Sequence, residues 1–385
     1  MKLDRLDRSG RGVSVFASTV RFMRVSKGYE AMIAHRRDDP TGRRNFLKGA
    51  LASCLSTFVS EAFCGTRSEK IPYWDDHAGF GYAGPRDMAL LDKWRSAGVD
   101  YLSINVGYDA VPWSTTIRAI ADYTNAIEAR SDTVLCSTFS QVLATWRAGK
   151  MAVTFDIEGM GSLHGDVSMV ESYYRLGVRQ MLIAYNLNND AGGGCHDQDG
   201  GLTDFGRAVV REMNRVGMVV DCAHSGIKSG LEAMKLSSKP CIFSHANARA
   251  LHDHERNITD EQIRAVAATG GVVGVNGLNR FLGDGAPTVE SLVSHIDYMA
   301  KLVGTDHVGI GLDYDPSSGP GLDESTSARY WPARQYPDSI QEESLPPSTL
   351  PQVTQQLRSK GYGESDIRAM MGGNFIRVAS QVWAK

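Results

Sequence analysis

The 385-residue chain contains no run of eighteen apolar residues, so the sequence predicts no membrane-spanning helix. None of its six cysteines forms a C-x-x-C pair, which argues against a structural zinc knot. We expect these thiols to be free and buried, with disulfides as the alternative. Beyond residue 48, basic residues do not outnumber acidic ones. Residues 1–48 carry twelve Lys/Arg against five Asp/Glu, a net charge of +7, whereas the whole chain has a net charge of −3. A basic head on an acidic body is typical of a targeting segment and does not indicate a nucleic-acid partner.

The basic head contains a pattern typical of protein export. Residues 41–48 read TGRRNFLK, which resembles a twin-arginine signal, and a mild apolar stretch follows from Gly49 to Val59. Ser60-Glu61-Ala62 then offers small residues where a signal peptidase would cut. We therefore predict a leader over 1–62, a catalytic domain over 70–385 and a periplasmic location. The alternative is a chance arginine pair before a short amphipathic helix.

From about residue 70, short apolar runs alternate with amphipathic stretches, which indicates a parallel α/β fold. Eight runs are candidate strands: 72–78, 101–106, 151–158, 180–185, 218–224, 241–245, 271–276 and 307–313. Eight strands with helical crossovers predict a TIM (β/α)8 barrel. An open, doubly wound sheet is the alternative.

Local signals mark several other segments. One helix is predicted to start at Thr203, and another at Thr259, where Gln262 completes a capping box. Residues 365–380 are expected to form a closing helix. The Pro-rich stretch 332–351 is expected to lie over the barrel mouth or at a dimer contact.

Polar residues able to bind a metal stand at the ends of five predicted strands. In a barrel these carboxyl ends converge on one face, so residues far apart in sequence would share one pocket. A lone histidine is most simply a buried core residue, but five such coincidences predict a metal site, with zinc preferred by imidazole and carboxylate ligands. These residues are His77, Glu158, His224, His245 and Asp313.

Each candidate has a proposed task. The two oxygens of Glu158 can bridge metals, and Asp313 can hold a nucleophilic water and pass its proton to a leaving amine. Arg256 can bind a substrate carboxylate in bidentate fashion. The alternatives are a structural cap for Asp313 and a surface ion pair for Arg256.

Long stretches of the chain resemble the renal, or membrane, dipeptidase family from about residue 72 onward. They are IEGMGSL (157–163), GLTDFGRAVVREMNRVGMVVDCAHSG (201–226), SHANARALHDHERNITDEQIRAVAATGGVVGVN (244–276) and LVGTDHVGIGLDYD (302–315). The resemblance implies a TIM barrel with two zinc ions in a homodimer. It also implies that Glu158 bridges the metals, that His224 and His245 bind the second metal, that Arg256 binds the substrate carboxylate and that Asp313 is catalytic.

The chain departs from the family at two positions. The family's first strand ends in His-x-Asp, but here His77 is followed by Ala78 and Gly79, so one metal-binding carboxylate is missing. We therefore expect one tightly bound Zn²⁺ and a second, weaker site. The family's substrate-binding histidine appears as Tyr185, which can hydrogen-bond an oxyanion but also fits a packed rim aromatic. In the loop GGGCHDQDGG (192–201), side chains such as Cys195, His196 or Asp199 could fill the metal gap, but a flexible rim is the expected state.

These observations predict a metallo-dipeptidase that cleaves dipeptides or dipeptide-like small molecules. Two alternatives stay open: an amidohydrolase with a non-dipeptide substrate, and a non-catalytic metal-binding barrel. The retained strand-end residues favour an enzyme, whereas Gly79 and Tyr185 favour a changed substrate or a lost metal.

Overall fold

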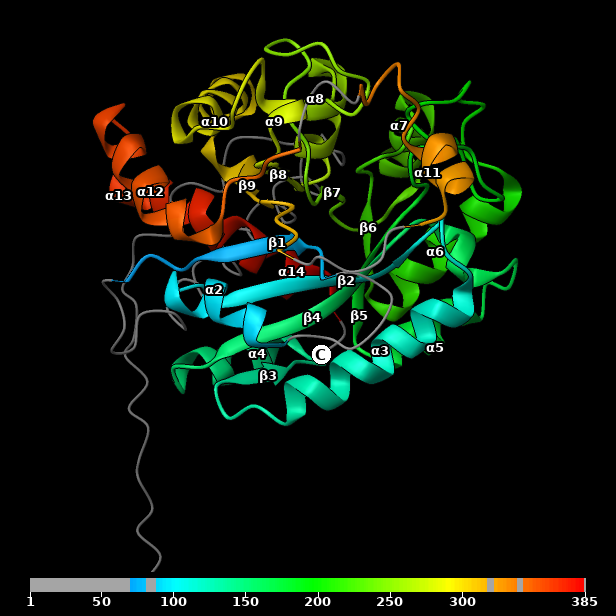
Figure 1. Ribbon diagram of the computed structural model, residues 1–385, viewed down its shortest axis with the longest axis horizontal. Helices are drawn as coiled ribbons and strands as arrows, with labels where there is room; N and C mark the ends of the chain where they lie inside the picture. The colour runs from blue at the N-terminus through cyan, green and yellow to red at the C-terminus, as the bar shows by residue number, and fades with distance from the viewer. Residues whose placement is uncertain (1–69, 81–87, 317–321, 338–341, 384–385) are drawn as a thin grey trace, which may run out of the picture. The chain divides into compact units, whose positions relative to one another are not determined.

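The computed structural model describes residues 70–80, 88–316, 322–337 and 342–383 (Figure 1). The predicted leader, with Arg43 and Arg44, lies outside the described residues. Among those that are described, no helix has the length and apolar character to cross a bilayer.

Eight parallel strands form a barrel, with helices around the outside (Figure 1). The order in the sheet follows the chain: β1 (Trp74–Ala78), β2 (Tyr101–Tyr108), β4 (Met151–Glu158), β5 (Val178–Leu182), β6 (Val219–Asp221), β7 (Ile242–Phe243), β8 (Val272–Val275) and β9 (Val308–Ile310). The circle closes just after β9, where Ala78 pairs with Tyr314 in parallel and the Asp313 N–H donates to the His77 carbonyl at 3.1 Å. The predicted TIM barrel is therefore confirmed.

The sequence located all eight barrel strands but extended some of them too far. The strands that precede His224 and His245 end at Asp221 and Phe243, so both histidines lie in turns beyond the ladder. At His224 and Asp313 the backbone is left-handed, with φ of +58° and +54°. Left-handed residues cannot continue a strand. A short strand, β3 (Thr133–Leu135), pairs with β4 outside the barrel circle and was not predicted.

The crossover helices begin where the predicted caps stand. The Thr203 side chain accepts the Gly206 N–H, and Thr259 forms the expected capping box with Gln262. The longer helices are α3 (Trp113–Glu128), α4 (Phe139–Arg147), α6 (Asp204–Val216), α7 (Ile227–Leu236), α8 (Asp260–Ala268), α10 (Val289–Val303) and α12 (Leu350–Ser359). Shorter ones are α2 (Asp92–Ser96), α5 (Met169–Arg175), α9 (Asn279–Leu282) and α11 (Glu324–Tyr330).

The C-terminal segment closes one end of the barrel. In place of one helix over 365–380, α13 (Glu364–Arg368) leads through a π-helical turn at Ala369–Gly373 into α14 (Asn374–Val382). Apolar residues of α14 pack on the first residues of the strands, including Trp74, Tyr101 and Val272. This covers the amino ends of the strands and leaves the carboxyl ends as the place for a site.

Candidate metal centre and active-site cavity

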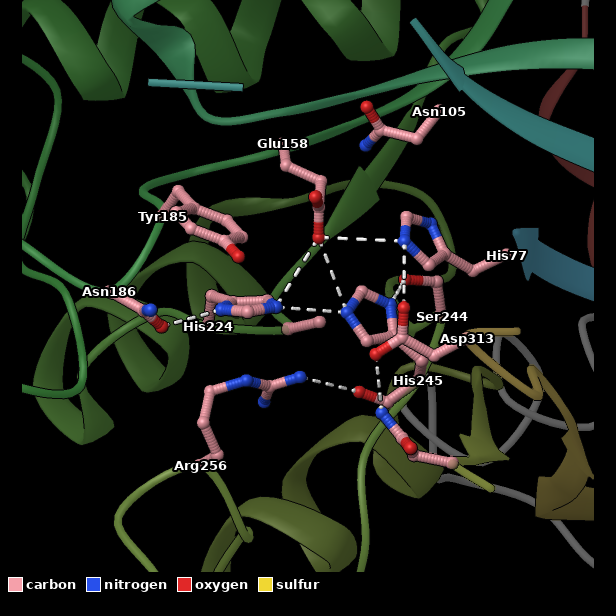
Figure 2. Close-up of polar contacts among 12 residues, drawn as sticks. His77, Asn105, Glu158, Tyr185, Asn186, His224, Ser244, His245, Arg256 and Asp313 are labelled. Carbon is pink, nitrogen blue, oxygen red and sulfur yellow. Dashed lines mark hydrogen bonds and ion pairs between the residues drawn. The ribbon is translucent and has the colours of Figure 1, made fainter. Parts of the chain in front are cut away.

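Four of the predicted residues meet at the carboxyl end of the barrel (Figure 2). The Oε1 atom of Glu158 lies 3.3 Å from Nε2 of His224, 3.3 Å from Nε2 of His245 and 3.6 Å from Nε2 of His77. All four residues are buried. One carboxylate oxygen thus contacts three imidazoles that come from strands far apart in the sequence.

The protonation of the two facing histidines fits a metal. Nδ1 of His224 donates to Oδ1 of Asn186 at 2.6 Å, so a neutral His224 keeps a bare lone pair on Nε2. That Nε2 lies 3.0 Å from Nε2 of His245. Burial holds the pKa of His224 and of His245 well below the usual value, which keeps both rings neutral. Two neutral nitrogens facing each other beside a carboxylate are donors suited to a divalent cation of the zinc type.

His77 is held by a hydrogen-bonded carboxylate behind it. Its Nδ1 lies 3.1 Å from Oδ1 of Asp156, which also accepts hydrogen bonds from Ser103 at 2.6 Å and Asn105 at 3.0 Å. This arrangement leaves Nε2 of His77 directed at Glu158 and Asp313, each 3.6 Å away. A carboxylate behind a histidine is the usual support of a metal-binding imidazole.

Burial also sets the charge state of Glu158. It raises the pKa of this carboxyl to about 8, while the nearby His77 and Arg256 act in the opposite direction. Without a cation the pocket therefore favours a protonated Glu158 near neutral pH. A bound divalent ion would replace that proton.

Asp313 lies beside this cluster in a strained turn. Its Oδ2 accepts a hydrogen bond from Asn276 Nδ2 at 2.8 Å, and burial raises its pKa. Among the described non-glycine residues, four have positive φ, and three of these, Asn186, His224 and Asp313, belong to this site. Strained backbone concentrates at functional sites because the surrounding structure holds catalytic groups in fixed positions.

A cavity of about 760 Å³ opens onto the cluster, a size suited to a small ligand. Tyr185 lines it and stacks on His224 with ring centroids 4.2 Å apart, and Figure 2 shows its hydroxyl turned toward Glu158. Tyr108, Trp331 and Tyr336 add aromatic surface to the wall. The described parts of 332–351 therefore border the mouth, as one of the two readings predicted.

Arg256 lies on the other side of the histidines. It is buried, its Nη2 donates to the His245 carbonyl at 3.1 Å, and its Nε has no hydrogen-bond partner among the described residues. It lines a neighbouring cavity of about 510 Å³, and His224 borders both cavities. The structure thus excludes a surface ion pair for Arg256 and places it next to a predicted metal ligand.

Helix α11 is tied to the histidine cluster by one side chain. Asn186, which orients His224, also donates from Nδ2 to the Tyr330 carbonyl at 3.0 Å. The Tyr330 hydroxyl donates to the Asp109 carbonyl at 3.0 Å. The last residue of α11 is therefore one hydrogen bond away from the residue that positions His224.

The space beside Gly79, where the sequence lacks a metal-binding carboxylate, is occupied by another residue. A Cβ atom on Gly79 would lie 2.7 Å from Oδ2 and 2.9 Å from Cβ of Asp315, so the Asp315 carboxylate already fills that space. Gly79 has no positive φ, which means that space, not backbone conformation, requires the glycine here.

The loop 192–201 does not fill the metal gap and is not a loose rim. The Cys195 thiol contacts Asn186 Oδ1 at 3.6 Å, and His196 bonds Glu255 and Tyr336. Asp199 accepts hydrogen bonds from Ser229. Of these partners, Asn186 is the one that the site already includes, through its bond to His224. Of the cysteines in the described part of the chain, all are free as expected: Cys136, Cys195, Cys222 and Cys241.

Sequence reasoning missed several residues of the site. Asp156 stands two positions before Glu158 on the same face of β4, so strand alternation could have identified it, whereas Asp315 follows a left-handed turn at Asp313 that alternation does not cover. Asn186 carried no comparable signal, because its role depends on a turn with φ +59°.

Comparisons with known proteins indicate the family of the chain. The sequence pattern of the membrane dipeptidase family (peptidase family M19) matches residues 113–330. Dipeptidase verJ of Clonostachys rogersoniana is 29% identical over 273 residues, covering 69% of this chain and 65% of that protein. An uncharacterized dipeptidase of Schizosaccharomyces pombe is 33% identical over 202 residues, 50% of this chain and 47% of that protein. The chain thus spans less than two thirds of the length of these two curated relatives.

A solved structure extends the likeness over most of the barrel. The crystal structure of an amidohydrolase from Pseudomonas aeruginosa is 28% identical, with a TM-score of 0.75, and covers 82% of this chain and 97% of its own. The family pattern includes Glu158, His224, His245 and Arg256 within its matched range and extends over more than half of the sequence. With a parallel barrel that gathers these residues at its carboxyl end, the chain belongs to the membrane dipeptidase family.

Proposed function

We propose that this protein is an exported zinc hydrolase that cleaves the amide bond of dipeptides or dipeptide-like small molecules. The main support is the contact of one Glu158 oxygen with three imidazoles beneath a cavity of about 760 Å³. Glu158, His224 and His245 are the zinc ligands in this proposal, with His77 beside them. A zinc ion held there supplies the Lewis acidity that makes water a nucleophile near neutral pH.

The chain's own residues position the substrate and move the proton. Asp313, whose Oδ1 faces the cluster, accepts the proton of the attacking water and delivers it to the leaving amine. Tyr185, with its hydroxyl toward Glu158, donates a hydrogen bond to the oxyanion that forms at the scissile carbonyl. Arg256 binds the substrate carboxylate, and its unpartnered buried Nε supports this assignment.

A second candidate is an amidohydrolase whose substrate is not a dipeptide. Tyr185 favours it, because a neutral phenol replaces the histidine that the family resemblance implies, and Tyr108 and Trp331 make the wall aromatic. Such a wall suits a flat or apolar group on the substrate.

The decisive experiment is hydrolysis of a panel by the purified protein loaded with zinc. The panel contains dipeptides with L- and D-residues at the C-terminal position, N-acyl amino acids and aryl amides. Turnover of free dipeptides supports the first candidate, and turnover of acylated or aryl amides alone supports the second. No turnover in a zinc-loaded protein would point to a non-catalytic barrel. The homodimer implied by the resemblance stays a prediction, which sedimentation of the purified protein would test.

A further inference from the structure

The segment after β9, which closes the barrel, places the carboxylates of Asp313 and Asp315 at the cavity. Ala78 pairs in parallel with Tyr314, so Gly79 and Asp315 are neighbours across the closing seam. Ala78 belongs to the apolar core and Tyr314 packs against that core. Side chains alternate along extended backbone, so His77 and Gly79 on either side of Ala78 face the opposite way, while Asp313 and Asp315 flank Tyr314 across the seam. All four of these line the cavity of about 760 Å³.

Asp315 occupies the place that a side chain on residue 79 would need. The ideal Cβ of Gly79 falls 2.7 Å from Asp315 Oδ2 and 2.9 Å from its Cγ. A carboxylate on the closing segment therefore substitutes in space for a side chain on β1. Gly79 lies two residues after His77, whose Nε2 faces Glu158 and Asp313 at 3.6 Å.

Three carboxylates lie together at this wall of the cavity, and their negative charge would favour a bound cation. Glu158, Asp313 and Asp315 converge on the cavity beside the imidazole of His77. Carboxylates gathered at one wall repel one another, and a divalent ion bound among them would offset that repulsion.

We infer that Asp315 is a metal ligand, completing a second cation position with His77 and Glu158 in place of a ligand on β1. This inference rests on the proposed function only in taking Glu158, His224 and His245 as the first zinc position. It replaces the sequence-based expectation of a weak second site with two well-populated ones. Carboxylate and imidazole donors suit zinc at both positions.

The test is a zinc titration of chelator-stripped protein, with calorimetry for affinity and elemental analysis for metal per chain. The unmodified protein should bind two ions. Asp315→Gly should keep one ion and bind the second about 100-fold more weakly or not at all, because a direct ligand is lost. Glu324→Gln is the matched control, since Glu324 lines the same cavity away from His77, and it should bind two ions.

A double variant that exchanges the residues at positions 79 and 315 tests the inference from the opposite side. Asp315→Gly removes the atoms that collide with a side chain at residue 79, so Gly79→Asp combined with Asp315→Gly returns a carboxylate to the same space from β1. This double variant should recover the second ion. Thermal unfolding of each variant shows that the barrel has folded.

Several outcomes would overturn the inference. These are one ion in the unmodified protein, two ions of unchanged affinity in Asp315→Gly, or a folded exchange variant that still binds one ion. A higher KM for dipeptides in Asp315→Gly with both ions retained would assign Asp315 to the substrate ammonium instead. Two ions without hydrolysis of any panel compound would refute the proposed function but leave the metal assignment standing.

Discussion

Glu158 makes the site depend on a single side chain, because one of its oxygens contacts three imidazole nitrogens within 3.6 Å. The three histidines come from β1 and from the turns after β6 and β7, so no two of them share a local segment. Their convergence depends on the whole barrel, whereas Glu158 is the carboxylate that contacts all three of them. Substitutions at this scale should therefore affect metal binding more than folding.

Replacing one of the facing histidines should release the metal. We expect His245→Ala to lower zinc affinity by about 100-fold or more, because a site with few protein ligands loses a direct bond. Equilibrium dialysis followed by elemental analysis would measure this. His307→Ala is the control, since His307 precedes β9 at the opposite end of the barrel and bonds the Gly271 carbonyl. Unchanged metal in His245→Ala would remove His245 from the site.

Asp313 should matter for turnover and not for metal content. Asp313→Asn keeps the shape and can still pair with Asn276, but it cannot accept a proton. We expect kcat to fall by about 100-fold or more, the range for a lost general base. Steady-state kinetics on the best panel substrate, together with metal analysis, would test this. Turnover close to that of the unmodified enzyme would mean that another group moves the proton.

Zinc affinity should depend on pH with a defined sign. Burial raises the pKa of Glu158 to about 8 in the metal-free protein, so below that pH the carboxyl carries a proton that zinc must displace. Affinity should therefore rise as the pH increases from 6 to 8 and level off above 8. Calorimetry at pH 7 in two buffers of different ionisation enthalpy should detect proton release. Binding without release would show that Glu158 is already ionised.

At the scale of elements, the loops after the strands are held together by Asp109, just beyond β2. Its carboxylate accepts the N–H groups of Gly161 and Tyr185 at 2.8 and 3.0 Å and the amide of Asn189 at 2.8 Å. A Cβ on Gly159 or Gly161 would come within 2.6 Å of that carboxylate. The glycines of the sequence EGMG thus make room for the group that fixes the rim of the cavity.

Removing this carboxylate should loosen the rim. Asp109→Ala leaves three donors without their acceptor, and we expect a loss of about 2 kcal/mol or more in the free energy of unfolding. Urea unfolding would measure it. Asp166→Ala provides the comparison, because the exposed carboxylate of Asp166 accepts the N–H of nearby Ser168, and its removal should change stability by less than about 0.5 kcal/mol. Equal losses in the two variants would contradict the role given to Asp109.

The sequence predicted the strands and the residues at their ends but not how the chain turns after them. Apolar runs identify strands because buried parallel strands are apolar on both faces, and Glu158 and His77 follow directly from them. The positions of His224 and Asp313 depend on left-handed turns that no periodicity encodes. The same limit applies at Gly79, where the sequence shows only that a carboxylate is missing. The Asp315 carboxylate fills that space, but the two residues become neighbours only when the barrel closes.

At the scale of the whole molecule, the barrel separates stability from function. Helix α14 packs on the amino ends of the strands, while the polar cluster occupies the carboxyl ends. Substitutions at the α14 end can therefore change stability while leaving the chemistry of the site intact.

The export proposal concerns the part of the chain that precedes the barrel. Replacing Arg43 and Arg44 by Lys should leave the precursor inside the cell, because the twin-arginine pathway reads the arginine pair. Fractionation of cells expressing each version would measure this, with Arg36 and Arg37 replaced by Lys as the matched control. Normal delivery of the Arg43/Arg44 variant to the periplasm would show that export uses another route.

The bond from Asn186 to the end of α11 has a thermodynamic consequence. The Tyr330 carbonyl holds the amide that orients His224, so in the proposed zinc site we expect the docking of α11 and the binding of zinc to favour each other. Linkage makes such an effect reciprocal: if docking of α11 tightens zinc by some factor, zinc tightens the docking of α11 by the same factor. A substrate that packs against Trp331 would then strengthen metal retention during each turnover, and the empty enzyme would be the form that most readily exchanges its metal.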